Sequence, residues 1–158
     1  MRSVAALVHA HRQYNWVTVI KGSAGGYRLV FTTLSDAAYF LQVTKSAQAH
    51  SPEQDRAIRV CVLLSWIAVE SFVSEQITKD DVAVVKPKTL LQRISFLLAR
   101  KGATVDAVKF RRLRSIRNML THPGRVTIGY APPPAIAQET FQFCVQLMQD
   151  LYHLPLCY

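Results

Sequence analysis

The chain has 158 residues, half of them hydrophobic, which suits one globular domain with a proper core and excludes an intrinsically disordered chain. Its 19 lysines and arginines against 10 aspartates and glutamates give a formal net charge of +9, which favours a polyanionic partner such as RNA. The apolar runs at residues 4–8 and 60–69 are too short for a signal peptide and a membrane span. We therefore expect a cytoplasmic protein with no membrane partner.

The first predicted element is a β-hairpin over residues 14–33. Aromatic and β-branched residues alternate with other side chains in 14–20, glycines supply a turn at 22–26, and 27–33 is again rich in residues that favour strands. A single hairpin is marginal by itself, so it has to pack on helices or pair across a dimer. We treat residues 1–35 as an N-terminal extension that carries this hairpin.

Helical signals fill the rest of the chain. Ser35 and Asp36 are expected to cap a helix over 36–49, and Ser51, Pro52 and Gln54 give the N-cap, first-turn proline and capping-box partner of the next. That second helix extends to about residue 78 and is apolar on every side in its middle, as expected for the central helix of a bundle. Three further helices are predicted, at 89–101 with Gly102 as its C-cap, at 106–122 and at 137–154.

These elements predict a mainly all-α fold. We expect one domain over residues 1–158, with a four- to five-helix up-and-down bundle in 36–155 and the hairpin before it. Cys61 and Cys144 sit among apolar neighbours and are predicted to be small core residues. With Cys157 they lack the spacing of a metal site, so neither zinc nor a cofactor is expected.

The most informative stretch is 109–124, K-F-R-R-L-R-S-I-R-N-M-L-T-H-P-G. Its apolar residues recur at steps of three and four, which describes the inner face of an amphipathic helix. These are Phe110, Leu113, Ile116 and Leu120. Arg117 falls inside the same apolar arc, and a guanidinium there needs a carboxylate, a phosphate or a partner subunit, because an unpaired buried charge is costly.

His122 lies at the predicted C-terminal end of this helix, where unpaired carbonyls favour the imidazolium form. Arg111, Asn118 and His122 share its polar side. Glu70 interrupts the apolar run of the central helix and needs a partner if it is buried. It could pair with Arg117 or orient the site, or the helix could have reached solvent at Glu70 and Glu75.

The residues Arg117, Asn118 and His122, written R-N-x-x-x-H, resemble the signature of the HEPN superfamily (higher eukaryotes and prokaryotes nucleotide-binding). The resemblance covers residues 36–155, with the motif late in the chain and a long apolar helix upstream. It implies a symmetric homodimer in which two motifs form one composite site of a metal-independent endoribonuclease. It also implies that Arg117 holds the scissile phosphate, that His122 is the general acid or base, and that Asn118 positions the substrate or the histidine. An acid in the helix that carries Glu70 also occurs in that superfamily.

Many HEPN proteins are toxins or act in antiviral defence, and an antitoxin of the nucleotidyltransferase type often restrains them. Such a partner is therefore possible here. Charge, and not the motif, suggests a further group of residues as RNA backbone contacts, although they could equally form a solvated basic face. These are Lys109, Arg111, Arg112, Arg114 and Arg125. The alternatives to a ribonuclease are a non-catalytic HEPN-like RNA-binding or protein-interaction module and an unrelated helical bundle.

Overall fold

The computed structural model describes residues 26–77, 89–121 and 132–152. Within these ranges the regular structure consists of five α-helices, without a strand, which confirms the all-α prediction. Their bounds are α2 Gly26–Ser46, α3 Pro52–Gln76, α5 Leu90–Ala99, α6 Ala107–Thr121 and α7 Pro134–Tyr152.

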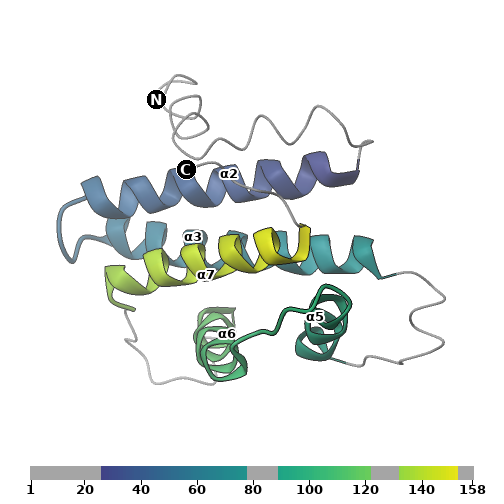
Figure 1. Cartoon of the computed structure of the whole chain (residues 1–158). Helices are drawn as coiled ribbons and strands as arrows, with labels where there is room; N and C mark the ends of the chain where they lie inside the picture. The colour runs from purple at the N-terminus through teal and green to yellow at the C-terminus, as the bar shows by residue number, and fades with distance from the viewer. Residues whose placement is uncertain (1–25, 78–88, 122–131, 153–158) are drawn as a thin grey trace.

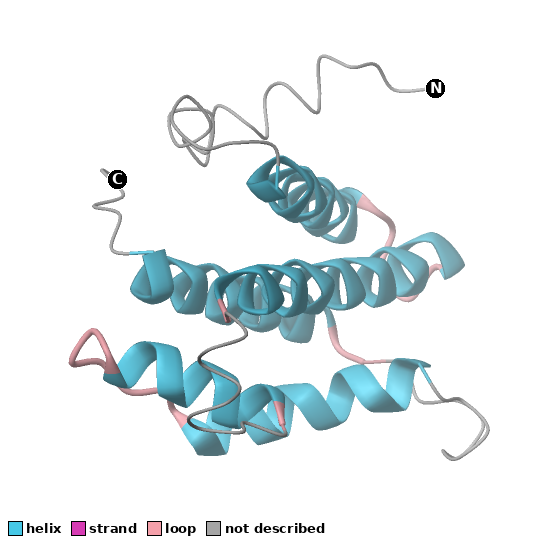
Figure 2. Cartoon of the chain, turned by 90° about the vertical axis from the view of Figure 1, so that its right-hand side faces the viewer, coloured by secondary structure: helices cyan, strands magenta, loops and turns pink. Residues whose placement is uncertain are grey.

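The five helices form two groups (Figure 1). Helices α2, α3 and α7 lie side by side, with α2 running opposite to α3 and α7 running in the same direction as α3. Helices α5 and α6 lie below them and are seen nearly end-on in Figure 1, but along their length in Figure 2. The short helices therefore cross the long ones, whereas an up-and-down bundle would keep all five nearly parallel or antiparallel.

Helix α3 is the centre of the fold, because it contacts α2, α5, α6 and α7. It is long and apolar enough to cross a membrane by length and composition alone. Its apolar surface has partners within the bundle: Cys61, Val62, Trp66, Val69 and Phe72 are all buried. The predicted central helix is thus confirmed, and its contacts with four helices account for most of its apolar surface. One side is not covered, because Ile67 in the middle of α3 is 43% exposed.

Helix α2 corrects the hairpin prediction. The proposed second strand, 27–33, is helical, while the first strand and its turn lie outside the described residues. Val30, Leu34, Ala37 and Leu41 are buried at steps of four, three and four, which is the inner face of a helix packed on α3. Tertiary packing thus outweighs the β propensity of the local aromatic and β-branched residues.

Ser35 is therefore not the N-cap of a helix. It lies in the interior of α2, where its hydroxyl donates a hydrogen bond of 2.9 Å to the Phe31 carbonyl one turn earlier. The helix begins at Gly26 and ends at Ser46. The boundary that we predicted between an extension and the bundle, at residue 35, consequently falls inside α2.

The start of α3 follows the predicted capping signals with one change. The Ser51 hydroxyl accepts a hydrogen bond of 3.1 Å from the Gln54 backbone N–H, and Pro52 is the first helical residue. The Gln54 side chain, however, accepts from the backbone N–H of His50 at 2.9 Å and donates to the Thr44 carbonyl at 3.0 Å. Gln54 thus joins the end of α2 to the start of α3.

Gly102 lies in the turn that ends α5. Its φ of +68° lies in the left-handed region, the Gly102 N–H bonds to the Ala99 carbonyl, and the Ala103 N–H bonds to the Leu98 carbonyl. This pair of bonds is the Schellman arrangement. The C-cap of α5 is Arg100, so Gly102 closes the turn two residues beyond the cap and is not itself the cap. At the other end, Thr89 and Gln92 form a complete capping box.

Gly102→Ala is expected to lower the free energy of unfolding by about 1–2 kcal/mol. A Cβ at this position would meet no atom within 4 Å, so the cost comes from the backbone conformation alone. Gly102→Asn should cost less, because asparagine tolerates the left-handed region better than alanine. Urea unfolding of the three proteins measures the difference, and equal stability of the alanine and asparagine variants would contradict it.

Cys61 and Cys144 are free thiols buried in the core, as predicted. Burial raises the pKa of the Cys61 thiol from 9.0 to about 12, with a smaller opposing effect of the hydrogen bond with Ser65. Burial also raises the pKa of Cys144 well above its ordinary value. Both groups therefore stay as unreactive thiols at neutral pH.

We expect iodoacetamide to label Cys61 and Cys144 only after the protein unfolds. Mass spectrometry of the labelled peptides distinguishes these positions from Cys157, and rapid labelling of either buried thiol in the native protein would contradict the prediction. Because the pKa of Cys61 is higher in the folded state, its protonated thiol stabilises the fold fully below pH 9.0, and this contribution is lost as the pH rises toward about 12.

Candidate functional site

Helix α6 carries the predicted site, and its inner face fixes its orientation. Phe110, Leu113, Ile116 and Leu120 are buried, as their spacing predicts. The Asp106 carboxylate accepts a hydrogen bond of 2.9 Å from the Lys109 backbone N–H and so caps the first turn. Because these four apolar side chains face the core, the arginines of α6 are distributed over its flanks and its outer side.

Glu70 is the acid that faces these arginines. On α3, its carboxylate forms an ion pair with the Arg114 guanidinium, and Nη2 of Arg117 lies 3.4 Å from the same Oε1 atom. The predicted pair between Glu70 and Arg117 is therefore present. The stronger contact belongs to Arg114, which the sequence analysis assigned to RNA instead.

Arg117 is partly buried, with 20% of its side chain exposed. Its Nη1 atom donates a hydrogen bond of 3.2 Å to Oδ1 of Asn118, while its buried Nε lacks a hydrogen-bond partner among the described residues. This guanidinium has therefore not used all of its donors. Because the Nε atom is itself buried, a phosphate could reach Arg117 only through its Nη groups, which can offer two parallel N–H bonds to an anion.

Arg114 is held from two sides. Its guanidinium lies over the Trp66 ring, with Cζ 5.3 Å from the ring centroid, in addition to its ion pair with Glu70. Trp66 is fully buried and packs edge-on against Phe110, with 5.2 Å between the ring centroids. Trp66 precedes Glu70 by one helical turn, so a single face of α3 supplies both contacts.

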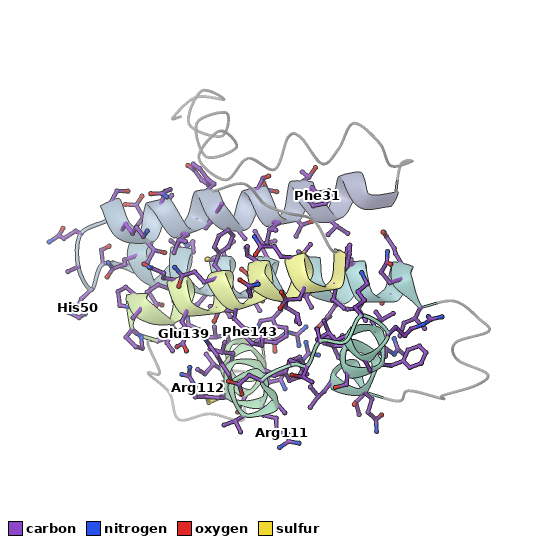
Figure 3. The ribbon with its side chains drawn as sticks, in the orientation of Figure 1. Phe31, His50, Arg111, Arg112, Glu139 and Phe143 are labelled. Atoms are coloured by element: carbon purple, nitrogen blue, oxygen red, sulfur yellow. The ribbon has the colours of Figure 1, made fainter. Side chains whose placement is uncertain are left out.

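A second acid, Glu139 of α7, faces the opposite flank of α6. It pairs with Arg112 and lies 3.9 Å from the Lys109 ammonium, and Lys109 also lies over the Phe143 ring at 5.7 Å. Figure 3 shows Arg112 and Glu139 facing each other across α6 and α7, while Arg111 points away from α7. Within the described part of the chain, Arg111 has neither an ion pair nor a side-chain hydrogen bond.

The five cations of α6 thus meet two carboxylates, Glu70 and Glu139. Five positive charges less two negative charges leave a net charge of +3 for these seven residues. Three of the predicted RNA contacts, Lys109, Arg112 and Arg114, have intramolecular partners. Arg117 also pairs with Glu70, so a polyanion would meet Arg111 with the least competition from acids among the described residues.

Two of the predicted residues lie outside the described ranges. His122 directly follows Thr121, the last residue of α6, and Arg125 comes three residues later. The structure therefore brings together Glu70, Arg117 and Asn118 of the predicted catalytic set. Among the described residues, no group of three His, Cys, Asp or Glu side chains could hold a metal ion.

Sequence reasoning did not find Trp66 and Glu139. Trp66 could have been found, because it precedes Glu70 by four residues on a helix that was correctly predicted. Glu139 could not, since its pairing with Arg112 depends on how α7 packs against the other helices. Comparison of the chain with protein-family models, curated proteins and solved structures found no match.

Proposed function

We propose that the protein is a metal-independent endoribonuclease of HEPN type that acts as a homodimer in the cytoplasm, as a toxin or in defence. The observation that carries the proposal is the state of Arg117. It is a partly buried guanidinium that precedes the histidine of an R-N-x-x-x-H motif by five residues, and its Nε atom has no hydrogen-bond partner among the described residues. The excess positive charge of α6 supports RNA as the substrate.

Cleavage through the ribose 2′-OH needs proton transfer and stabilisation of the charge that develops on the phosphorus centre. Arg117 would hold the scissile phosphate through paired N–H groups, and His122 would move protons. Asn118 would orient Arg117 through the hydrogen bond that its Oδ1 atom accepts. Glu70 would keep Arg117 in place before the substrate binds.

The homodimer follows from the spacing of the motif. Arg117 and His122 are five positions apart, which is about 140° around a helix, so one helical copy does not put both on one face. Two copies that meet at a two-fold axis would supply an arginine and a histidine to one site. A monomer in light scattering at micromolar concentration would remove this part of the proposal.

The ion pairs of Glu70 favour a second candidate, a non-catalytic HEPN-like module that binds RNA or a protein such as an antitoxin. If the ion pair between Glu70 and Arg117 persists in the presence of RNA, the guanidinium is structural and cannot bind a phosphate. Such a module would bind RNA with strong salt dependence but release no product.

The deciding experiment is incubation of RNA with the wild-type protein in excess chelator. We expect cleavage that leaves a 2′,3′-cyclic phosphate on one product, because the 2′-OH is the attacking group. Salt-dependent binding without any product would favour the non-catalytic module. Neither binding nor cleavage would contradict both candidates.

A further inference from the structure

A recess between α5 and the start of α6 has a volume of about 650 Å³. This volume falls in the range of sites for small-molecule ligands. Its walls are largely apolar, and the Ser95 and Thr104 side chains add hydroxyl groups. Its lining includes Leu91, Ser95, Phe96, Ala99, Thr104 and Arg111.

The surroundings of the recess are strongly basic. Residues 89–121 include eight lysines and arginines and one acid, Asp106. Arg111 belongs to the lining, and the Arg100 guanidinium lies over the Phe96 ring with 5.2 Å between Cζ and the ring centroid. The recess thus combines an apolar floor, an aromatic ring and positive charge, which together suit single-stranded nucleic acid.

Few large hydrophobic side chains are exposed outside the recess in the described part of the chain. Among the described residues, the large hydrophobic side chains that are exposed are Ile67 and Val108, and neither lines it. A stable protein interface buries more than about 1,000 Å² around its apolar centre. An apolar recess within a basic surface is better matched by an apolar group on an anionic chain, which describes a base on its phosphate backbone.

We propose that this recess binds one unpaired base of a single-stranded RNA whose phosphates contact Arg111. The base contacts the apolar wall and the Phe96 ring, and the Ser95 and Thr104 hydroxyls are available to its polar edge. Arg111 precedes Arg117 by six residues, about 9 Å along the axis of α6 and about 120° around it, so a strand that reaches both has to pass around the helix. The proposal rests on the proposed function and adds a position where a base, and not only backbone charge, contributes to binding.

The test uses the full-length protein and a single-stranded RNA with 2′-O-methyl groups, which cannot be cleaved through the 2′-OH. Ala99→Leu and Ser95→Leu fill the recess from two exposed positions without changing any charge. We expect each to weaken binding about fivefold to a hundredfold with the dependence on salt unchanged. The matched control is Ala135→Leu, an exposed alanine in the first turn of α7 that does not line the recess, and it should bind as the wild type does.

Two further measurements separate a base from other ligands. An abasic version of the oligonucleotide should bind the wild type about as weakly as the intact one binds Ala99→Leu. Arg111→Gln should instead lower the slope of log affinity against log salt by about 0.7, because it removes one phosphate contact from a single strand. Thermal melting confirms that each variant is folded.

Three results would overturn the inference. The first is unchanged affinity in folded Ala99→Leu and Ser95→Leu, and the second is equal affinity for intact and abasic RNA. The third is an equal effect of the filling substitutions on binding of polyglutamate, which would indicate an acidic peptide site. Because the RNA cannot be cleaved, these outcomes are independent of whether the wild type is a ribonuclease, and absence of cleavage does not alter them.

Discussion

Replacing Arg117 with alanine is expected to reduce RNA cleavage by a factor of about a hundred to a thousand, which is the usual effect of removing one group that stabilises transition-state charge. The guanidinium is the only group of the motif for which the structure describes both partial burial and an unused donor. Loss of the Arg117 guanidinium should not leave the Glu70 carboxylate without a partner, because Arg114 still pairs with it.

Initial rates in excess chelator measure this effect, and Arg117→Lys provides a stricter test. Lysine keeps the charge but cannot hold a phosphate through two parallel N–H groups, so most of the activity should still be lost. The matched control is Arg112→Ala, a neighbour on α6 whose carboxylate partner is Glu139. It should weaken RNA binding at low salt and leave the maximal rate nearly unchanged, whereas wild-type rates for Arg117→Ala would show that the site is elsewhere.

The second large effect is an energetic coupling between Glu70 and Arg114. The guanidiniums of Arg114 and Arg117 face the same carboxylate oxygen of Glu70. The ion pair with Arg114 therefore determines how strongly Glu70 competes with RNA for Arg117. In Arg114→Gln, Glu70 retains Arg117 as its remaining cation in this cluster. RNA affinity should then fall about tenfold, because the protein has lost one positive charge and because Glu70 binds Arg117 more strongly.

The same substitution should have a smaller effect once Glu70 is neutral. In the Glu70→Gln background we expect Arg114→Gln to lower RNA affinity only about twofold, so the coupling free energy is about 1 kcal/mol. Binding of 2′-O-methyl RNA to the wild type, the two single variants and the double variant measures it. Additive effects of the two substitutions on RNA affinity would mean that Arg114 contacts the RNA backbone directly, as its charge alone predicts.

A matched cycle controls for general electrostatics. Arg112→Gln removes the same charge from the same helix, but Arg112 pairs with Glu139 and not with Glu70. Its effect on RNA affinity should therefore be nearly the same with and without Glu70→Gln. Equal coupling of Glu70 to Arg112 and to Arg114 would reflect the overall electrostatic field of the protein and not the contact with Arg114.

Local chain chemistry explains where the predictions of helix ends succeeded and why the hairpin prediction failed. Proline at the first helical position, the capping residues Ser51 and Thr89, and glycine at 102 act within one or two turns, so the ends that they determine were predictable. In 27–33 the aromatic and β-branched residues pointed to a strand. The buried series that continues from Val30 to Leu41 shows that contact with α3 selects the helix there.

The sequence by itself determined the helical character of the chain, the inner face of α6 and the partly buried position of Arg117, because each follows from a periodicity of three to four residues. Only the tertiary structure decided which carboxylate meets which arginine. Glu70 is 44 residues from Arg114, and Glu139 is 27 residues from Arg112. Such pairs depend on how the helices cross, and many charged residues along the chain could have satisfied the same need for a partner.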